Sequence, residues 1–507
     1  MLKVIIRADA SSYIGSGHIM RCLVLADALK RCGHDVLFAT RPQNGDLVAL
    51  IKQRGFSIYA LQQPVDWLVP STTADYAAWL QVSEYDDAQE CATAFDSPDL
   101  VITDHYGIGA QWHKVVKKAY NCKIIAIDDL VREHTADLVI DQTLLRESSE
   151  YHLLNPKTTA LTGTQYAIVN THFSHRHSLQ LATLNTLANT PRVLLSMGGI
   201  DAPNATLHVL NVLKKRASPP ITTVLLSPRA PHYKSVAEFA AEHSAWLTHI
   251  DFVDDMAGLM CEHDIAIGAP GSTSWERACV GLPSIVIALA DNQQTICKNL
   301  ETVGAAICVD LEAISKNLMK AYEQLIADYS KMRTINLQLC DGQGVKRIMK
   351  HITKLLSGSL TLRLATQLDV EQVYAWQCKP ETRRYALNKD VPSLAEHRVW
   401  MTKKLASKND YFYIIELTNG EDEKTTPVGV VRLDMAVDNT YTISIFIAPE
   451  HFGKGVAKLA LKQIDILHPT ETIHAVVLKE NTASQVLFSR AGYQRINEEQ
   501  FTRQPVE

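Results

Sequence analysis

The sequence has no Cys-x-x-Cys pair, no long hydrophobic run and no excess of positive charge. Its ten cysteines are scattered, which argues against a zinc ribbon or a disulfide framework and favours reduced thiols. The apolar runs fall far short of the roughly 18 residues that a membrane span needs. A net charge of −5 lacks the basic footprint of a nucleic-acid binder. No His, Asp and Glu cluster stands at metal-ligand spacing, so we expect no metal.

The remaining composition is typical of a globular enzyme. The chain has 507 residues, of which 46% are hydrophobic and 21% charged, too many residues for one core and enough for several domains. Met1 to Val4 lead directly into a strand pattern without a secretory leader. We therefore expect a cytoplasmic protein with small-molecule substrates.

The first two thirds alternate short buried-type strands with helices, the pattern of doubly wound parallel sheets. We predict one Rossmann-like domain at residues 1–150 and a second at 160–356, with Arg146–Gly163 as a linker. Together they form a cleft at the carboxyl ends of both sheets. The predicted strands are Lys3–Ile6, Asp35–Ala39, Leu100–Thr103, Lys123–Ile127, Leu138–Ile140, Val193–Ser196, Thr222–Leu226, Leu247–Ile250, Ile265–Ile267, Ser284–Ile287 and Ala306–Val309.

The last third has a different pattern. Ser357-Gly358-Ser359 resembles a linker, and three strand candidates then follow one another directly. Adjacent strands indicate an antiparallel α+β domain, which we place at residues 360–507. The predicted elements there are strands at Leu360–Ala365, Tyr411–Leu417, Val428–Asp434, Tyr441–Ala448 and Ile473–Leu478, helices at Val456–Ile466 and Ala483–Ala491, and a short strand near Tyr493.

The most informative motif is Gly15-Ser16-Gly17-His18-Ile19-Met20-Arg21-Cys22. It follows a strand pattern and opens a helix, where glycine permits close approach and free N–H groups attract anions. His18 stands at this turn as a candidate base. Gly17 is expected at the ligand, while Asp9 and Arg21 flank the turn and either contact sugar or phosphate or pair with one another.

Two further glycine turns close strands at the same predicted cleft. In Gly268–Arg277, we expect Ser272 or Thr273 to cap a helix whose N–H groups face a diphosphate. The candidate ligand contacts of the two turns and of the following strand end are Gly198, Gly271, Ser272, Thr273, Ser274, Glu276, Asn292 and Gln293. Glu276 is suited to a ribose diol, although an acid in a first helical turn is also simply favourable to the dipole.

Other polar residues also follow strands. Asp104 with His105, and Asp128 with Asp129, end two of them. Such positions line the crevice of a doubly wound sheet, but aspartate there is equally common as a helix cap. The sequence does not decide whether these residues contact a ligand or cap helices.

These motifs resemble the UDP-sugar hydrolases of pseudaminic acid biosynthesis, which have the two-domain glycosyltransferase-B fold. The resemblance covers roughly the first two thirds of the chain. It is carried by Arg7–Ser11, Gly15–Cys22, Ile125–Asp129, Met197–Gly199 and Gly271–Arg277. It implies hydrolysis of UDP-2,4-diacetamido-2,4,6-trideoxy-β-L-altrose to UDP and free sugar, with His18 acting on the attacking water and Gly271–Glu276 binding UDP. The family's usual arginine is replaced by Asn170.

The last third resembles the GCN5-related N-acetyltransferases over about residues 360–500. The glycine turn from Glu450 to Ala457 exposes N–H groups to a pyrophosphate, and Asn481–Tyr493 follows. The resemblance implies acetyl-CoA as acetyl donor, and Phe488 replaces the family's frequent tyrosine acid. Asp434 and Glu480 are weak candidates for the base. The expected cofactor contacts are Phe452, Gly453, Lys454, Gly455, Val456, Ala457, Asn481 and Ser484.

The leading hypothesis is a bifunctional enzyme that N-acetylates a 4-amino UDP-sugar and hydrolyses the diacetamido product. A glycosyltransferase of the same fold and a nucleotide-sugar sensor fused to an acetyltransferase are the alternatives. A dinucleotide dehydrogenase is disfavoured because Met20 and Arg21 occupy the region of the third glycine of Gly-x-Gly-x-x-Gly.

Overall fold

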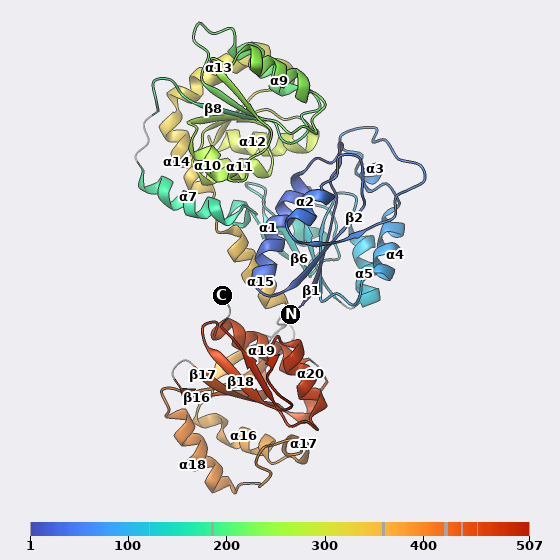
Figure 1. Ribbon diagram of the computed structural model, residues 1–507, viewed down its shortest axis with the longest axis vertical. Helices are drawn as coiled ribbons and strands as arrows, with labels where there is room; N and C mark the ends of the chain where they lie inside the picture. Colours follow the sequence, from blue (N-terminus) through green and yellow to red (C-terminus); the bar gives the residue numbers. More distant parts are fainter. Residues whose placement is uncertain are drawn as a thin grey trace. The chain divides into compact units, whose positions relative to one another are not determined.

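The computed structural model describes residues 2–120, 122–183, 187–356, 360–419, 424–437, 440–453 and 455–505. The chain divides into two compact units, Leu2–His351 and Ile352–Glu507, and Figure 1 shows two sheets in the first. Each unit is described by itself. The predicted linker residues 357–359 lie outside the described ranges.

The first sheet is wholly parallel, with strand order β3-β2-β1-β4-β5-β6-β7. Its central strands are continuous apolar runs, as expected for strands covered on both faces. The strands are β1 (Lys3–Ala8), β2 (Asp35–Thr40), β3 (Ser57–Ala60), β4 (Leu100–Asp104), β5 (Lys123–Ile127), β6 (Leu138–Asp141) and β7 (Thr159–Thr162).

Helices cover both faces of this sheet. Ala88 and Cys91 of α4 and Trp112 of α5 pack into the core on one face, while α1 packs against β1, β2 and β4. The helices are α1 (Gly17–Arg31), α2 (Val48–Gln53), α3 (Tyr76–Leu80), α4 (Glu84–Ala94), α5 (Ala110–Tyr120) and α6 (Ser148–Leu154).

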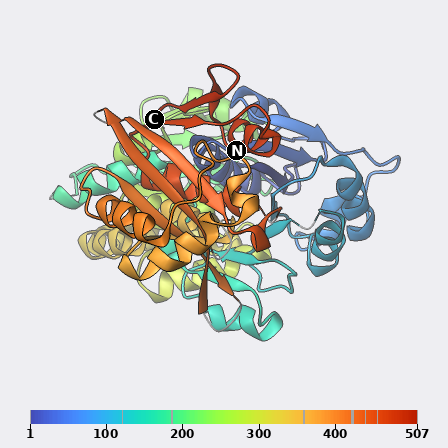
Figure 2. The same ribbon diagram turned by 90° about the horizontal axis from the view of Figure 1, so that it is seen from below.

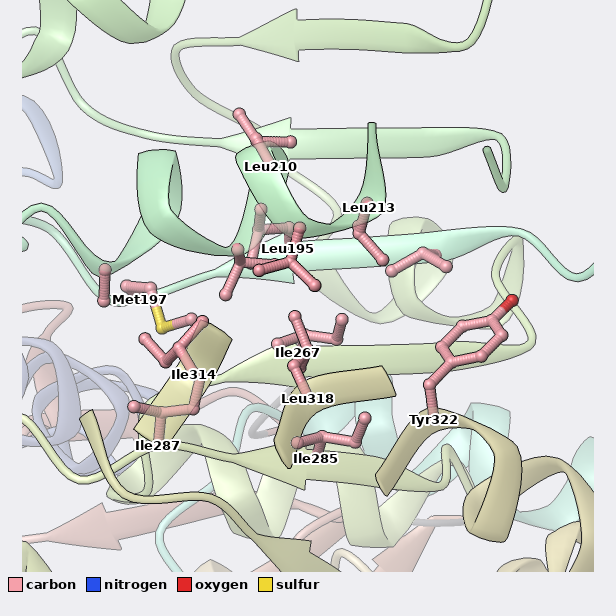
Figure 3. Packing of buried hydrophobic residues seen from close by; sticks show 14 of the residues in the cluster. Leu195, Met197, Leu210, Leu213, Ile267, Ile285, Ile287, Ile314, Leu318 and Tyr322 are labelled. Atoms are coloured by element: carbon pink, nitrogen blue, oxygen red, sulfur yellow. The ribbon is translucent and has the colours of Figure 1, made fainter. Parts of the chain in front are cut away.

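The second sheet is also parallel and has the order β10-β9-β8-β11-β12-β13. Figure 3 shows its core, where Leu195 and Ile267 of neighbouring strands pack against Leu210 and Leu318 from two covering helices. A separate cluster around Trp275 fills the other face. The strands are β8 (Val193–Ser196), β9 (Thr222–Leu225), β10 (Leu247–Ile250), β11 (Ile265–Gly268), β12 (Ser284–Val286) and β13 (Ala306–Cys308).

The helices of this half fall into two layers. Those that line the core of Figure 3 are α8 (Ala205–Leu213), α9 (Tyr233–Glu242) and α13 (Ile314–Ala327). The cluster around Trp275 is lined by α7 (Thr171–Ala182), α10 (Met256–Cys261), α11 (Ser272–Cys279) and α12 (Gln294–Thr302). Helix α14 (Tyr329–Leu339) contributes to both clusters, and α15 (Gly344–Leu356) follows it and contacts residues 165–167. After β13, residues 314–356 form the three helices α13, α14 and α15, which are separated at Asp328 and at residues 340–343.

The second unit contains a mixed sheet of order β14-β15-β16-β17-β18-β20-β19. Its long strands β15–β17 run side by side in the turned view of Figure 2. All pairs are antiparallel except β17 with β18. The strands are β14 (Leu360–Leu364), β15 (Tyr411–Asn419), β16 (Lys424–Val437), β17 (Thr440–Ile447), β18 (Thr472–Val476), β19 (Gln494–Arg495) and β20 (Gln500–Arg503).

Two layers of helices sandwich this mixed sheet, as Figure 1 shows. Val373 and Met401, from α16 and α18, pack on one face, and Ala460 and Phe488, from α19 and α20, on the other. The helices are α16 (Val370–Gln377), α17 (Pro380–Arg383), α18 (Leu394–Leu405), α19 (Val456–Leu467) and α20 (Thr482–Arg490).

The predicted linker Arg146–Gly163 is wrong. This segment contains α6 and the edge strand β7, which pairs with β6 through Ile140 and Leu161. The edge strands β3 and β7 were missed because an edge strand needs few apolar residues. The short strand β20, which lies between β18 and β19, was also missed. The strand predictions of both parallel sheets are otherwise confirmed to within two residues.

A substitution at Gly268 tests the packing of β11 against β8 in the second sheet. A Cβ added there would collide with the carbonyl oxygen of Ser196 on β8 and lie 2.9 Å from a guanidinium nitrogen of Arg277. Gly268→Ala is therefore expected to destabilise the Leu2–His351 unit by about 1–3 kcal/mol, the usual cost of overpacking. The control is Gly17→Ala, where a Cβ meets nothing within 4 Å. Equal thermal unfolding midpoints for both variants would contradict the packing described.

Candidate active site

The first glycine turn connects β1 to α1 at the carboxyl edge of the first sheet. Gly15 has a φ of +79°, which glycine adopts without strain, and α1 then begins at Gly17. Ala8, the last residue of β1, is in register with Asp104, the last residue of β4. Because parallel neighbours end at the same edge, the side chain of Asp104 lies beside the start of α1.

His18 is held by Asp104. Its Nδ1 lies 2.6 Å from Oδ1 of this carboxylate, so Nδ1–H donates and Nε2, on the other side of the ring, remains an acceptor. The His18 ring is 7% exposed and has Tyr106 edge-on at 4.7 Å between centroids. These contacts give the imidazole one orientation and one tautomer, as a general base requires.

Arg21 holds the other side of the same carboxylate. Its Nε and Nη2 donate to the two oxygens of Asp104 at 2.6 and 2.7 Å, and Nη1 donates to Asp129 at 2.7 Å. Burial acts to raise the pKa of Asp104, but the charges of Arg21 and then His18 hold it well below its usual range. Asp104 is therefore ionised, and Arg21 orients the carboxylate instead of reaching a phosphate.

Asp129 joins this network through Tyr106, whose hydroxyl donates to it at 2.8 Å. Burial, followed by the charge of Asp129, raises the pKa of this phenol. Trp79 stacks beside Tyr106 and also faces His18, at centroid distances of 5.8 and 6.5 Å. Aromatic rings thus form one wall around the imidazole.

Asp9 is completely buried and is not paired with Arg21. Its Oδ1 accepts hydrogen bonds from Arg7 at 2.6 Å and from the backbone N–H of Arg41 at 2.8 Å. Burial acts to raise the pKa of Asp9, but Arg7 and then His105 lower it. Its Oδ2 has no hydrogen-bond partner among the described residues and lies 3.6 Å from Nε2 of His105.

The glycine turns of the two sheets meet. A Cβ on Gly199 would lie 3.2 Å from the hydroxyl of Ser16, which belongs to the first turn. The side chain of Gln142 donates to Ser272 at 3.4 Å. A Cβ added to Gly17, Gly198 or Gly271 meets no atom within 4 Å, so space is open beside each of them.

Helix α11 begins at Ser272, with Gly271 at the N-cap. The expectation that Ser272 or Thr273 caps this helix is wrong, because both residues are already inside its first turn. Both residues are partly exposed, whereas Ser274 is buried and its hydroxyl accepts from Gly271 N at 3.3 Å and Arg277 at 3.1 Å. Among the described residues, the N–H groups of Ser272 and Thr273 have no acceptor, and such donors at a helix start bind anions.

Glu276 lies one turn further along α11 and is partly exposed. Burial raises the pKa of its carboxyl to about 7, against the opposing charge of Arg277. Its backbone carbonyl oxygen accepts from the N–H of Val280 at 3.3 Å, but no described residue donates a hydrogen bond to its carboxylate. The carboxyl of Glu276 thus has a pKa near neutral pH and accepts no hydrogen bond in the described part of the chain. A carboxylate that binds a diol is expected to have these properties before its ligand binds.

Asn292 and Gln293 belong to a short 3-10 helix after β12. Gln293 accepts a hydrogen bond from the N–H of Leu289 at 2.8 Å, and the side chain of Asn292 lies outside the described part. Asp291, next to them, lies 3.4 Å from Thr73 of the first half. Asn170, at the position of the family's arginine, accepts from His172 N and caps α7.

The second unit has a glycine turn between β17 and α19. Gly453 and Gly455 both adopt positive φ, of +74° and +76°, and a Cβ on either would meet nothing within 4 Å. Consecutive N–H groups in such a turn form an anion-binding concavity. Phe452 is 50% exposed, and Val456 and Ala457 open α19. Lys454 lies outside the described residues.

Strands β17 and β18 separate beside this turn. They pair from Thr440 and Thr472 to Ile443 and Ala475, and β17 then continues to Ile447 without a partner on that side. The main-chain groups of residues 444–447 that face the gap are available to an extended ligand. An acyl-CoA, with its diphosphate and amide-containing arm, fits these two features together.

Asn481, Ser484 and Phe488 belong to the start and body of α20. The side chain of Asn481 accepts from Ser484 N at 3.1 Å and caps the helix. Phe488 is buried between Tyr493 and Phe501. Asp434 is bound by Lys404 at 2.6 Å and Arg432 at 2.8 Å.

Sequence reasoning left Asp104 and Asp129 undecided and missed Tyr106 and Trp79. Tyr106 could have been found because it follows Asp104 closely at the end of a strand. Trp79 gave no such signal, because it belongs to a helix far from both His18 and Tyr106 in the sequence. In the described residues, no group of three or more His, Cys, Asp or Glu is arranged to hold a metal ion. Within the same residues, no helix is long and apolar enough to cross a membrane.

Two family models match the chain. Residues 204–352 match the glycosyltransferase family 28 C-terminal domain, and residues 359–494 match the acetyltransferase (GNAT) domain. The first match runs from α8 into α15 and includes the start of α11. The second contains β14 to β18 of the mixed sheet, the glycine turn and α20.

Curated relatives cover the chain in two ways. The UDP-2,4-diacetamido-2,4,6-trideoxy-β-L-altropyranose hydrolase of Campylobacter jejuni is 28% identical over 295 residues, 58% of this chain and 94% of the hydrolase. An uncharacterized protein of Methanocaldococcus jannaschii is 23% identical over 520 residues, 97% of both chains.

A solved structure of MurG from Acinetobacter baumannii overlays with a TM-score of 0.48 and 16% identity, over 70% of this chain and all of that one. The chain therefore joins two parallel-sheet, Rossmann-like halves, which are similar to a UDP-sugar hydrolase and whose second half matches the family 28 C-terminal model, to a mixed-sheet unit that matches the GNAT acetyltransferase model.

Proposed function

We propose that the chain is a bifunctional nucleotide-sugar enzyme of the pseudaminic acid route. Its acetyltransferase domain N-acetylates a 4-amino UDP-sugar, and its first unit hydrolyses the resulting UDP-2,4-diacetamido-2,4,6-trideoxy-β-L-altrose to UDP and free sugar. The observation that carries the hydrolase is the orientation of His18 by Asp104, at a glycine turn whose Ser16 lies close to Gly199 of the second half.

In the proposed hydrolysis, Nε2 of His18 takes a proton from water as the water attacks the anomeric carbon. Asp104 keeps the Nδ1 proton in place and stabilises the imidazolium that forms. The C–O bond to the diphosphate breaks, and direct displacement inverts the anomeric centre. The Tyr106 and Trp79 rings lie beside the imidazole, at centroid distances of 4.7 and 6.5 Å, and form an apolar wall next to the attacking water.

The second half holds the leaving nucleotide in this scheme. The N–H groups at the start of α11, with the hydroxyls of Ser272 and Thr273, face the diphosphate and stabilise the charge that develops on it. Glu276 accepts hydrogen bonds from the ribose hydroxyls. Gly17, Gly198 and Gly271 leave the space that phosphate and sugar need, while Asn292 and Gln293 border the same junction.

In the second unit, the Gly453–Ala457 turn binds the diphosphate of acetyl-CoA and the gap between β17 and β18 receives its arm. Acetyl-CoA supplies the activated acetyl group. Asn481 and Ser484 act from the start of α20, where Asn481 caps the helix. Phe488 has no ionisable group, so the departing thiolate takes its proton from elsewhere.

A glycosyltransferase of the same fold remains the second candidate, because family 28 transferases share the 204–352 region. The two differ in whether water or an alcohol attacks the sugar. Phosphorus NMR of UDP release in the absence of any acceptor alcohol decides between them. Release of UDP under these conditions supports the hydrolase.

His18→Ala tests the proposed base. It is expected to lower kcat for UDP release by about 10²- to 10⁴-fold, the usual contribution of a general base, while UDP affinity changes little. The reaction is run in heavy-oxygen water with the diacetamido UDP-sugar. Label in the free sugar supports C–O cleavage, and label in UDP would mean attack on phosphorus and overturn the mechanism.

Asp104→Asn tests the orientation of the base. The asparagine amide has one acceptor oxygen, so it cannot accept hydrogen bonds from both Nδ1–H of His18 and the two N–H groups of Arg21. We therefore expect kcat to fall by at least about 10-fold while UDP still binds. UDP binding measured by calorimetry reports that the variant is folded. Asp86→Asn, at an exposed position on α4, is the matched control. Wild-type turnover by folded Asp104→Asn would remove Asp104 from the mechanism.

Glu276 predicts a pH dependence of UDP binding. Its pKa is about 7 before binding because burial disfavours the charged form, and hydrogen bonds from ribose hydroxyls favour the charged form. UDP affinity should therefore weaken as pH falls from 8 to 6, more steeply for wild type than for Glu276→Gln. Comparing both proteins at each pH cancels the titration of UDP itself. Parallel pH profiles would place Glu276 outside the nucleotide site.

A further inference from the structure

One part of the mixed sheet exposes polar side chains on the face opposite α19. Side chains alternate between the two faces along each strand, and Ile443, Ile473 and Ala475 are buried on the α19 face. Thr442 and Ser444 of β17 and His474 and Val476 of β18 therefore point to the face on which α16 and α18 pack.

This region is open beyond those two helices. His474 and Ser444 are exposed, and Val476 is 42% exposed. Strand register aligns Asp434 with Thr442 and Thr442 with His474, so the three form a row across β16, β17 and β18. In the described part of the chain, no hydrogen bond or ion pair occupies the imidazole of His474.

The row lies at the point where β17 and β18 part. His474 directly precedes Ala475, the last residue of β18 that pairs with β17. Val456 and Ala460 of α19 are buried on the opposite face, so the glycine turn that opens α19 holds a diphosphate on that side. An arm that enters the gap from there brings its thioester end toward the face that carries His474.

We propose that His474 is the general base of the acetyl transfer, and that the acceptor amine binds on the exposed face between His474 and Asp434. The proposal rests on the acetyltransferase activity proposed above and names its acceptor face. His474 takes the place of Asp434 as the candidate base. The carboxylate of Asp434 accepts hydrogen bonds from Lys404 and Arg432 at 2.6 and 2.8 Å, so it is less available to accept a proton.

The proton and bond changes balance. His474 takes one proton from the ammonium form of the acceptor and later releases it to solvent. The amine nitrogen forms a bond to the acetyl carbonyl carbon, the C–S bond breaks, and the second proton of the nitrogen passes to the thiolate sulfur. The products are the N-acetyl compound and CoA thiol.

The charged groups beside the row balance one another. Arg432 and Lys404 bind Asp434 at 2.8 and 2.6 Å, and Lys404 also binds Asp410 at 3.0 Å, so two cations face two carboxylates. Arg432 also lies over the ring of Trp400, 5.1 Å from its centroid.

The first test needs no acceptor. Full-length protein carrying labelled histidine is titrated with acetyl-CoA and, separately, with CoA, and the His474 signal is assigned by its loss in His474→Gln. Acetyl-CoA is expected to shift this signal more than CoA does, because only the former places an acetyl group beside the ring. Binding of acetyl-CoA, seen by calorimetry, without any shift would overturn the role of His474 and leave the acetyltransferase assignment intact.

The second test measures turnover with the 4-amino UDP-sugar. His474→Ala is expected to lower kcat by about 10²-fold or more, with an unchanged KM for acetyl-CoA and partial recovery on adding imidazole. His152→Gln, an exposed histidine on α6, is the control. Undiminished kcat, or a loss that imidazole does not restore, contradicts the proposal. Failure of wild type to bind acetyl-CoA would instead reject the acetyltransferase assignment itself.

Discussion

The candidate hydrolase site depends on one buried anion, the carboxylate of Asp104. A carboxylate without exposure to water is tolerated only when strong donors satisfy it, and Arg21 and His18 supply them at 2.6 to 2.7 Å. The same bonds join α1 to the end of β4. Through Arg21 they extend to Asp129 and Tyr106, so the orientation of His18 is coupled to a network that spans the carboxyl edge of the first sheet.

The glycine turns provide what the charged network does not, namely space and amide donors. Ser16 and Gly199 approach closely where the two halves of the first unit meet, whereas Gly17, Gly198 and Gly271 border open space. A base from one sheet and a helix start from the other can thus serve one nucleotide sugar. Dividing the base and the leaving-group site between two sheets suits a reaction in which positive charge develops on the sugar and negative charge on the diphosphate.

The two proposed activities place opposite demands on their sites. Hydrolysis needs an enclosed imidazole, and His18 is 7% exposed behind aromatic rings. Acetyl transfer needs a base that an amine can reach from solution, and His474 is exposed on the sheet face. Phe488 contributes only apolar contacts in the second unit, which is consistent with proton transfer on the other face of the sheet.

The sequence by itself determined the three sheets and their glycine turns, because apolar strands and Gly-rich helix starts are local signals carried by a few adjacent residues. It also singled out His18. Only the tertiary structure decided that Asp104 orients the imidazole, that Arg21 binds Asp104 and not Asp9, and that His474 stands in a row with Asp434. These outcomes depend on strand register and on the pairing of residues far apart in the chain, which no local pattern encodes. The polar edge strands were missed for the same reason, since their neighbours in the sheet, and not their own side chains, make them strands.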